Sequence, residues 1–382
     1  MKLDFLKKVA VKLERKNNAV FTYPVKKQKE YLDKLKEPYN DVDRSYCQYC
    51  CQMQFNGRVM TILLNVLSLP LLVYYYMKKT CLTVRQEKYD AVFFSEGIPE
   101  HVIPDSLREE FAAWLTVGVH GEYFSKKDRK YFKHLIKKYP LSWHFLLKCL
   151  IKIRFYSYEI NIHSPKAIIV CGEYSFTSSV LTDYCAKNDV LHINVMHGEK
   201  LFFMRDSFFR FDRCYVWDEH YVKLFTSLKA SESQFIIELP PSLKFSETMK
   251  RNIEFDYTYY LASESEAVLQ KIAEVLEALK NKGYRISLRP HPRYSDKQQV
   301  IKYFSAVNIE DVSVLSIEES IMRTGHVVSL SSTVLNQALH NSIPIVIDNV
   351  SNPENYKKLG ELGYICLNKE HETLSQLIKR VS

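Results

Sequence analysis

Short apolar runs alternate with longer amphipathic segments along the chain from residue 88 onward. In the first part of this region, four apolar runs end in small or polar residues and predict buried strands at 89–97, 166–175, 190–199 and 211–219. The segment FTSSVLTDYCAKND, between the second and third runs, predicts a helix long enough for a crossover connection. A strand, a helix and another strand in this order predict a parallel sheet.

The same alternation recurs more regularly after residue 250. Apolar positions at helical spacing in SEAVLQKIAEVLEALKNKG predict an amphipathic helix that stops at Gly283. The other expected elements are strands at 255–263, 284–290, 312–316, 326–332, 343–349 and 364–367, with helices at 296–305, 317–323, 333–341 and at the C-terminus.

These patterns predict an α/β protein with two Rossmann-like domains, whose parallel sheets face a central cleft. The chain has 382 residues, which agrees with two domains because one domain usually holds roughly 100–200 residues. We place the first domain at 88–240 and the second at 250–382. A segment with two adjacent prolines, residues 237–247, reads as the linker.

Residues 1–87 read as a separate N-terminal region that is helical, basic and hydrophobic. Its first segment, MKLDFLKKVAVKLERK, has apolar residues at helical spacing, with lysines and arginines over much of the other face. This pattern fits a helix that lies on a membrane or on the next domain.

Residues 60–77 form an uncharged apolar stretch with Arg58 before it and Lys78 and Lys79 after it. The stretch fits either a buried helix of the first domain or a peripheral membrane contact. A complete bilayer span is the least favoured alternative, because the stretch is short, contains polar residues and has Pro70 at its centre.

The formal charge of +9, from 53 Lys and Arg against 44 Asp and Glu, suits anionic ligands or an anionic membrane surface. Nucleic acid is the weaker candidate, because the charge is spread along the chain without a zinc-finger spacing or an arginine-rich tail. Nine scattered cysteines without a cleavable signal predict reduced thiols in the cytoplasm.

The densest group of cysteines, CQYCC at 47–51, offers the start of a zinc site, but no second CxxC or HxxxH pair follows it. We therefore expect ordinary buried thiols there. Asp212, Asp218 and Asp348 do not have the spacing of a DxD metal motif. We expect no metal ion and no cofactor to be obligatory.

Polar side chains follow the expected strands in both domains, where open α/β sheets bind their ligands. The candidates are Glu96, Glu173, His197 and Glu199 in the first domain, and Arg289, His291, Pro292, Arg293, Ser331, Ser332 and Thr333 in the second. The chain has no GxGxxG fingerprint and no Walker A sequence, which disfavours a dinucleotide oxidoreductase and a P-loop NTPase.

The stretch YRISLRPHPR, residues 284–293, ends an expected strand in positive and rigid residues. Such residues suit a phosphate group, because a histidine can donate a hydrogen bond or a proton and an arginine can donate two parallel hydrogen bonds. The segment SLSST, residues 329–333, precedes a helix whose first N–H groups would also attract an anion. The alternatives are structural: His291 shapes a turn, the hydroxyls cap the helix, and Arg293 is solvated.

RPHPR and SLSST together resemble the HP and S motifs of bacterial sialyltransferases and polysialyltransferases, with related pairs in Kdo and glycerophosphate transferases. These are bacterial glycosyltransferases of the GT-B fold that make capsules and other surface polysaccharides. The likeness in layout covers roughly residues 88–370, although each motif is short. It implies that His291 and Pro292 take the HP role, that Ser331 and Ser332 take the S role, and that both contact the donor phosphate.

The resemblance implies a glycosyltransferase that moves a sugar from a nucleotide-activated donor, such as a CMP-linked one, to a growing surface glycan or a lipid-linked acceptor. It also implies a cytoplasmic location at the inner face of the cell membrane. The alternatives are a CDP-glycerol-type glycerophosphotransferase, a nucleotide-sugar epimerase or hydrolase, and a non-catalytic membrane-docked module with a degenerate fold.

The acceptor must lose a proton, so an inverting enzyme needs a base. Sialyltransferases of this kind carry a D/E-D/E-G motif for that purpose, whereas this chain has SEG at 95–97 and HGE at 197–199. Glu96, Glu173 and Glu199 are all candidates, and His197 could serve as the base or orient one of them. We favour Glu173 slightly, because it follows the clearest buried strand.

Overall fold

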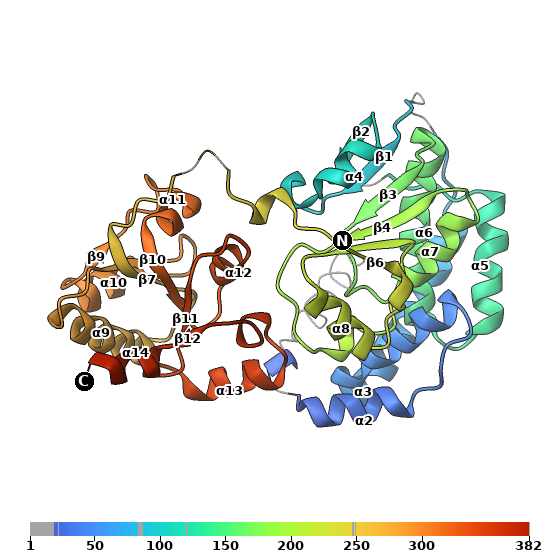
Figure 1. The fold of residues 1–382 in the computed structure, drawn as a ribbon. Coiled ribbons are helices and arrows are strands. Elements are labelled where there is room, and N and C mark those ends of the chain that lie inside the picture. Colours follow the sequence, from blue (N-terminus) through green and yellow to red (C-terminus); the bar gives the residue numbers. More distant parts are fainter. Residues whose placement is uncertain are drawn as a thin grey trace. The chain divides into compact units, whose positions relative to one another are not determined.

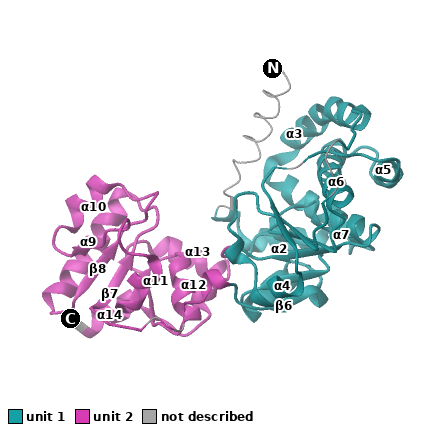
Figure 2. Ribbon diagram, turned by 90° about the horizontal axis from the view of Figure 1, so that it is seen from above, with its two compact units in different colours: residues 1–197, 202–240 teal, residues 198–201, 241–382 magenta. Residues whose placement is uncertain are grey.

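A computed structural model describes residues 19–21, 23–82, 87–119, 121–246, 248 and 250–381 (Figure 1). The amphipathic segment expected at the N-terminus lies outside these residues. The chain divides into two compact units (Figure 2): unit 1 is Met1–His197 with Phe202–Pro240, and unit 2 is Gly198–Leu201 with Pro241–Ser382. The change from unit 1 to unit 2 at Pro240 falls inside the segment that was expected to be the linker.

Unit 1 contains a parallel sheet with six strands among the described residues, in the order β2-β1-β3-β4-β5-β6. The strands are β1 (Ala91–Phe94), β2 (Trp114–Val117), β3 (Ala167–Val170), β4 (Leu191–Val195), β5 (Arg213–Val216) and β6 (Phe235–Ile237). The helices are α2 (Val25–Lys34), α3 (Asp41–Met77), α4 (Asp105–Glu110), α5 (Lys126–Lys138), α6 (Trp143–His163), α7 (Ser178–Ala186) and α8 (Glu219–Ser227). From β1 the chain continues to β2 on one side and then to β3 on the other side. The carboxyl ends of β1 and β3 therefore form a topological switch point.

Alternate residues of β1 enter opposite layers of the unit 1 core. Ala91 and Phe93 join a buried cluster that includes Leu107 of α4. Phe94 points to the other layer, where its ring meets Tyr156 of α6 edge-on with centroids 4.9 Å apart. The apolar run in the sequence is continuous because a parallel strand is covered on both faces.

Unit 2 contains the second parallel sheet, also with six strands in the described part of the chain, in the order β12-β11-β10-β7-β8-β9. Its strands are β7 (Phe255–Tyr260), β8 (Ile286–Arg289), β9 (Asn308–Ile309), β10 (Thr324–Ser329), β11 (Ile345–Ile347) and β12 (Glu372–Thr373). Its helices are α9 (Glu266–Asn281), α10 (Lys297–Phe304), α11 (Ile317–Met322), α12 (Thr333–His340), α13 (Pro353–Glu361) and α14 (Leu374–Val381). This strand order is that of the dinucleotide-binding folds, with the switch point between β7 and β10.

The helices of unit 2 cover both faces of its sheet, as the doubly wound topology requires. Residues of α9, α10 and α14 share one buried cluster with β7 and β8. In Figure 1, α9 and α14 lie on one side of the sheet and α12 lies on the other. The α/β class with two parallel sheets is therefore confirmed, while the central cleft stays a prediction.

Two expected strands of unit 2 are not strands. Residues 312–316 form a turn, because the Asp311 carboxylate accepts hydrogen bonds from the backbone N–H and the hydroxyl of Ser313, at 2.9 and 2.6 Å. Residues 364–367 hold a short 3-10 helix, and the edge strand is β12 instead.

The region expected as a separate N-terminal body belongs to unit 1, because α3 packs against α6 and α7. This helix changes direction at Gly57, which has φ 72° and ψ 163°, a combination open essentially to glycine alone. The cysteines of CQYCC lie before that kink. Cys51 is fully buried, and burial raises the pKa of its thiol to about 12, so it packs as an apolar group.

Candidate active site

Three neighbouring strands of unit 2 end at the same level. Tyr260 of β7 pairs in register with Arg289 of β8, and on its other side the Tyr260 carbonyl accepts a 2.9 Å hydrogen bond from the Ser329 hydroxyl of β10. The loops that begin after these residues therefore leave one edge of the sheet together. The ends of β8 and β10 are two strand spacings apart, roughly 10 Å.

His291 is held in one tautomer by the loop after β8. Its Nδ1 accepts hydrogen bonds from the backbone N–H groups of Arg293 and Tyr294, at 3.1 and 3.3 Å. The neutral ring must then carry its proton on Nε2, which becomes a donor. Burial, and then the Arg293 guanidinium, lower the pKa of His291 below 6.5. The residue is therefore a neutral donor at pH 7, and the Tyr294 ring stacks on it at 4.5 Å between centroids.

The serine-rich segment begins α12 at the end of β10. Ser332 is the N-cap, and its hydroxyl accepts a 3.3 Å hydrogen bond from the N–H of Val334. Ser331 is half-buried and Thr333 is exposed. The capping role expected as an alternative is thus present. It occupies the Val334 N–H, and the positive end of the α12 dipole remains at the switch point, where it favours an anion. A phosphate-binding role for these hydroxyls stays a prediction.

The Arg289 side chain, at the end of β8, is held by partners inside unit 2. Its guanidinium donates to Glu310 at 3.0 Å and to the Leu315 carbonyl at 2.8 Å, and its side chain is 8% exposed. Glu310 also accepts a 2.6 Å hydrogen bond from the buried Ser320 hydroxyl. Arg289 thus has a structural role, and its expected donor-binding role stays a prediction. Pro292 and Arg293 are exposed beside His291, and their roles stay predictions.

Sequence reasoning missed Glu264, which lies in the loop after β7, between the loops that carry His291 and Ser331. Both of its carboxylate oxygens accept from the N–H of Ala262, at 2.8 and 2.9 Å. Burial raises the pKa of Glu264 above 4.5. The same criterion that selected Glu96 and Glu173, an acid just behind an apolar strand, would have found it.

Glu199 belongs to unit 2 and not to the first domain, where it was expected. Its carboxylate accepts a 2.6 Å hydrogen bond from the side-chain amide of Asn336 on α12. His197 is half-buried and is the last residue of the first segment of unit 1. The segment HGE is therefore divided between the two units, and its acid packs against the helix that follows the serine-rich motif.

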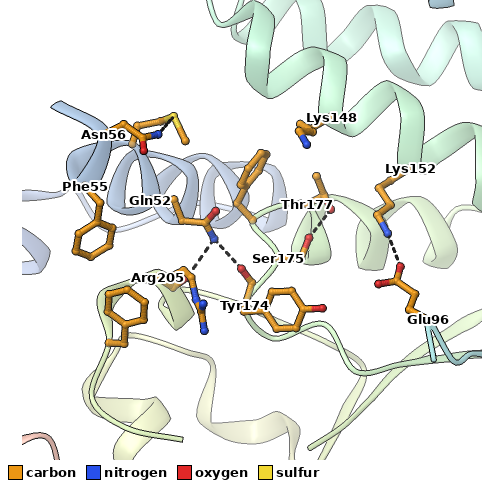
Figure 3. Close-up of a pocket in the computed structure, with 13 residues that line it drawn as sticks. Gln52, Phe55, Asn56, Glu96, Lys148, Lys152, Tyr174, Ser175, Thr177 and Arg205 are labelled. Carbon is orange, nitrogen blue, oxygen red and sulfur yellow. Dashed lines mark hydrogen bonds and ion pairs between the residues drawn. The ribbon is translucent and has the colours of Figure 1, made fainter. Parts of the chain in front are cut away.

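Unit 1 has a pocket of about 570 Å³ at its own switch point (Figure 3). The pocket is lined from α3, from the loops after β1 and β3, from α6 and from the segment around Arg205. The residues are Gln52, Met53, Phe55, Asn56, Glu96, Lys148, Lys152, Tyr174, Ser175, Phe176, Thr177, Phe203 and Arg205. A smaller hollow that shares Glu96, Lys152 and Tyr174 continues from it between the ends of β1 and β3.

Glu96 lines this pocket from the loop after β1. Its φ of 45° lies in the left-handed region, which a residue other than glycine adopts at a cost and which often marks a functional site. Its carboxylate accepts a hydrogen bond from Lys152 at 2.9 Å, and Figure 3 shows the two side chains pointing toward each other. Glu96 is thus the acid among the three base candidates that lines the unit 1 pocket.

Glu173, which we favoured as the base, does not line the pocket. Its side chain is fully buried, and its carboxylate accepts a 3.2 Å hydrogen bond from the Asn194 amide on β4. A buried carboxylate cannot take a proton from an acceptor that stays in the pocket, so we do not retain Glu173 as the base.

The pocket combines cations with aromatic rings. Lys148 and Lys152 come from α6, and Arg205 lies over the Phe203 ring with 4.9 Å to its centroid. Burial, and then Glu96, raise the pKa of the Tyr174 phenol to about 12, which keeps it a hydrogen-bond donor. Such a lining suits a sugar ring with an acidic or phosphorylated group, because rings pack on sugar faces and cations bind the anion.

No family model matches the sequence, and no curated protein matches it. Solved structures with a similar fold include the glycosyltransferase of kitacinnamycin, with 10% identity, TM-score 0.44 and coverage of 78% of this chain and 90% of that one. Others are the UDP-GlcNAc 2-epimerase of Neisseria meningitidis bound to UDP-GlcNAc (10%, 0.41, 76% and 89%) and the lipopolysaccharide outer core galactosyltransferase WaaB (9%, 0.39, 76% and 94%). All three TM-scores are below 0.5, so the fold assignment rests on the strand orders.

The buried pair of Arg289 and Glu310 predicts a stability effect. Arg289→Ala should lower the free energy of unfolding by about 3–5 kcal/mol, because it leaves the Glu310 carboxylate buried without its cation. Chemical denaturation measures this change. The control is Arg285→Ala, whose side chain is 55% exposed beside Asp256 and whose loss should cost far less. If Arg289→Ala keeps normal stability but loses nucleotide affinity, Arg289 belongs to the phosphate site after all.

Proposed function

We propose that the protein is a glycosyltransferase that uses a nucleotide-activated sugar, with the donor in unit 2 and the acceptor in the pocket of unit 1. The observation that carries this proposal is the neutral His291, whose Nε2–H is available as a donor at the same sheet edge as the start of α12. A neutral histidine and a helix N-terminus at a switch point form a site suited to the phosphates of a nucleotide.

The reaction would use these groups as follows. A hydroxyl oxygen of the acceptor attacks the anomeric carbon of the donor, and the bond from that carbon to the phosphate oxygen breaks. The acceptor proton passes to a base, for which Glu96 is the best-placed acid of unit 1. The nucleotide leaves as an anion, and its developing charge is stabilised by the Nε2–H of His291 and by the positive end of the α12 dipole.

The finer assignments rest on the motif resemblance alone. The HP and S motifs support a CMP-linked or related donor and an acceptor in a surface glycan, with CDP-glycerol as an alternative donor. Lys148 in the lining, with Lys152 and Arg205, whose charges are partly balanced by Glu96 and Asp206, supports an acceptor with an acidic or phosphorylated group. We propose that this chemistry takes place in the cytoplasm without an obligatory metal ion.

A thermal-shift screen against CMP, CDP, UDP, GDP and their sugars tests the donor site. A true ligand at a hundred times its dissociation constant should add about 2.7 kcal/mol of stability. Changing Ser331 and Ser332 together to Ala should weaken its binding by about 1–3 kcal/mol. Ser316→Ala is the matched control, because it removes the N-cap of α11 without touching the end of β10. The proposal fails if no nucleotide binds, and consumption of a nucleotide sugar without any acceptor would favour an epimerase or hydrolase.

His291→Ala should lower turnover about a hundredfold to ten-thousandfold with the fold intact, the usual range for a lost proton or hydrogen-bond donor. In the wild type, kcat should hold near neutral pH and fall once the pH drops below the lowered pKa of His291. Protonation at Nδ1 would then break the hydrogen bonds from Arg293 and Tyr294. His134→Ala, at an exposed position of α5, should change neither property. A His291 variant with normal turnover would exclude the residue from the mechanism.

Glu96→Gln should lower kcat by about a hundredfold or more and leave nucleotide affinity near normal, because a base acts on the acceptor in the transition state. Glu173→Gln is the comparison, since it alters a buried carboxylate and should change thermal stability more than kcat. Turnover under saturating donor and calorimetric nucleotide affinity separate the two effects. The opposite pattern, with a slow Glu173 variant and a normal Glu96 variant, would restore Glu173 as the base.

A further inference from the structure

The second half of α3 exposes an unusually apolar surface. Eight large apolar side chains point outward at helical spacing, with exposed fractions of 47–74%, and we call them the α3 apolar face: Val59, Ile62, Leu63, Val66, Leu67, Val73, Tyr74 and Met77. Soluble proteins rarely expose so many contiguous apolar side chains without a partner.

The opposite face of the same helix is fixed to unit 1. Leu64, Leu72 and Tyr75 are buried. The Asn65 amide donates to the Leu141 carbonyl at 2.7 Å and accepts from the N–H of His144 at 3.0 Å, while Arg154 donates to the Tyr75 carbonyl at 2.8 Å. Among the described residues, α3 is the helix long and apolar enough to cross a membrane, and 22% of its most apolar part is buried. Its hydrogen bonds to α6 along one face are those of a helix that lies on the surface of unit 1, not of a helix that spans a bilayer.

The charges around the face favour one class of partner. No charged residue occurs from 59 to 77, whereas Arg58 precedes the face and Lys78 and Lys79 follow it. The neighbouring α5 adds exposed lysines, and it lies beside the end of α3 because Arg129 donates to the Tyr76 carbonyl at 2.7 Å. Tyr74 is exposed at the basic end of the face, a position typical of a tyrosine at a membrane–water interface.

We propose that the α3 apolar face lies in the interface of an anionic lipid bilayer, with Arg58, Lys79 and the α5 lysines at the headgroup phosphates. A second copy of the chain would also cover apolar surface, but it would not account for basic residues at both ends of the face. Apolar burial and attraction to anionic lipids act together in such surface helices.

This docking has a consequence that rests on the proposed function. The first half of α3, before the kink at Gly57, supplies Gln52, Met53, Phe55 and Asn56 to the pocket of unit 1. The helix that contacts lipid would thus also line the acceptor site. An acceptor anchored in the bilayer, with an acidic or phosphorylated head, would reach that pocket without leaving the membrane.

Co-sedimentation of the full chain with phosphatidylcholine vesicles, with and without phosphatidylglycerol, tests the docking. The wild type should bind the anionic vesicles and be partly released by high salt, because salt screens the basic residues. The double variant Ile62→Glu with Val66→Glu should bind at least about tenfold more weakly, since two charges replace apolar side chains in the interface. The control, Ile301→Glu with Val314→Glu, changes an exposed Ile and an exposed Val of unit 2 and should bind as the wild type does.

Circular dichroism and thermal unfolding should be the same for both double variants, because all four positions are exposed. A fluorophore on the exposed Cys81, close to the end of α3, should shift to the blue with anionic vesicles in the wild type and not in the α3 variant. Equal vesicle binding by wild type and α3 variant overturns the proposal. The proposal is also overturned if the wild type is a dimer in sedimentation velocity, the α3 variant is a monomer, and neither protein binds vesicles. Vesicle binding needs no donor and no acceptor, so its outcome is independent of the proposed activity.

Discussion

Two glutamine side chains of α3 hold together the parts on which the unit 1 pocket depends. Gln48 donates to the carbonyls of Glu173 and Arg205 at 2.8 and 3.0 Å, and Gln52 donates to those of Tyr174 and Arg205 at 2.7 and 3.3 Å. These carbonyls lie in loops without a sheet partner of their own, so the amides satisfy groups that would be costly to leave unpaired. One helix thereby fixes the loop after β3, the segment around Arg205 and its own position on the unit.

The two units place chemistry at their switch points by different means. Unit 2 uses backbone geometry: a turn whose N–H groups select one tautomer of His291, and a helix that begins beside Ser332 and directs the positive end of its dipole to the same sheet edge. Unit 1 uses side chains, with Glu96 held by Lys152 in a left-handed conformation. A backbone site suits a ligand part that is constant, such as a phosphate, whereas a side-chain pocket suits a part that differs between substrates.

The sequence predicted the central strands well, because strands covered on both faces are continuous apolar runs. It missed the edge strands of both sheets, β2 and β6 in unit 1 and β9 and β12 in unit 2. These strands are short, their residues are mostly half-buried, and they carry a weaker pattern. It located the charged residues at the strand ends but did not predict where their side chains point. Glu173 turns inward because Asn194 lies on the adjacent strand, and Arg289 turns inward because Glu310 and Leu315 lie beside β8. Those partners are distant in sequence, so no local pattern could have revealed them. The tautomer of His291 likewise depends on loop geometry that composition does not encode.

Gly57 separates two parts of one helix: the part that lines the unit 1 pocket and the part that carries the α3 apolar face. A Cβ at this position would meet nothing within 4 Å, so the requirement for glycine is torsional and not steric. In an uninterrupted helix, successive side chains are rotated by about 100° around the axis. The direction of the pocket-lining side chains would then also determine the direction of the later apolar side chains. The kink removes that dependence. The pocket-lining residues and the outward stripe can therefore face directions that one regular helix could not give them together. A change at Gly57 would alter both at once.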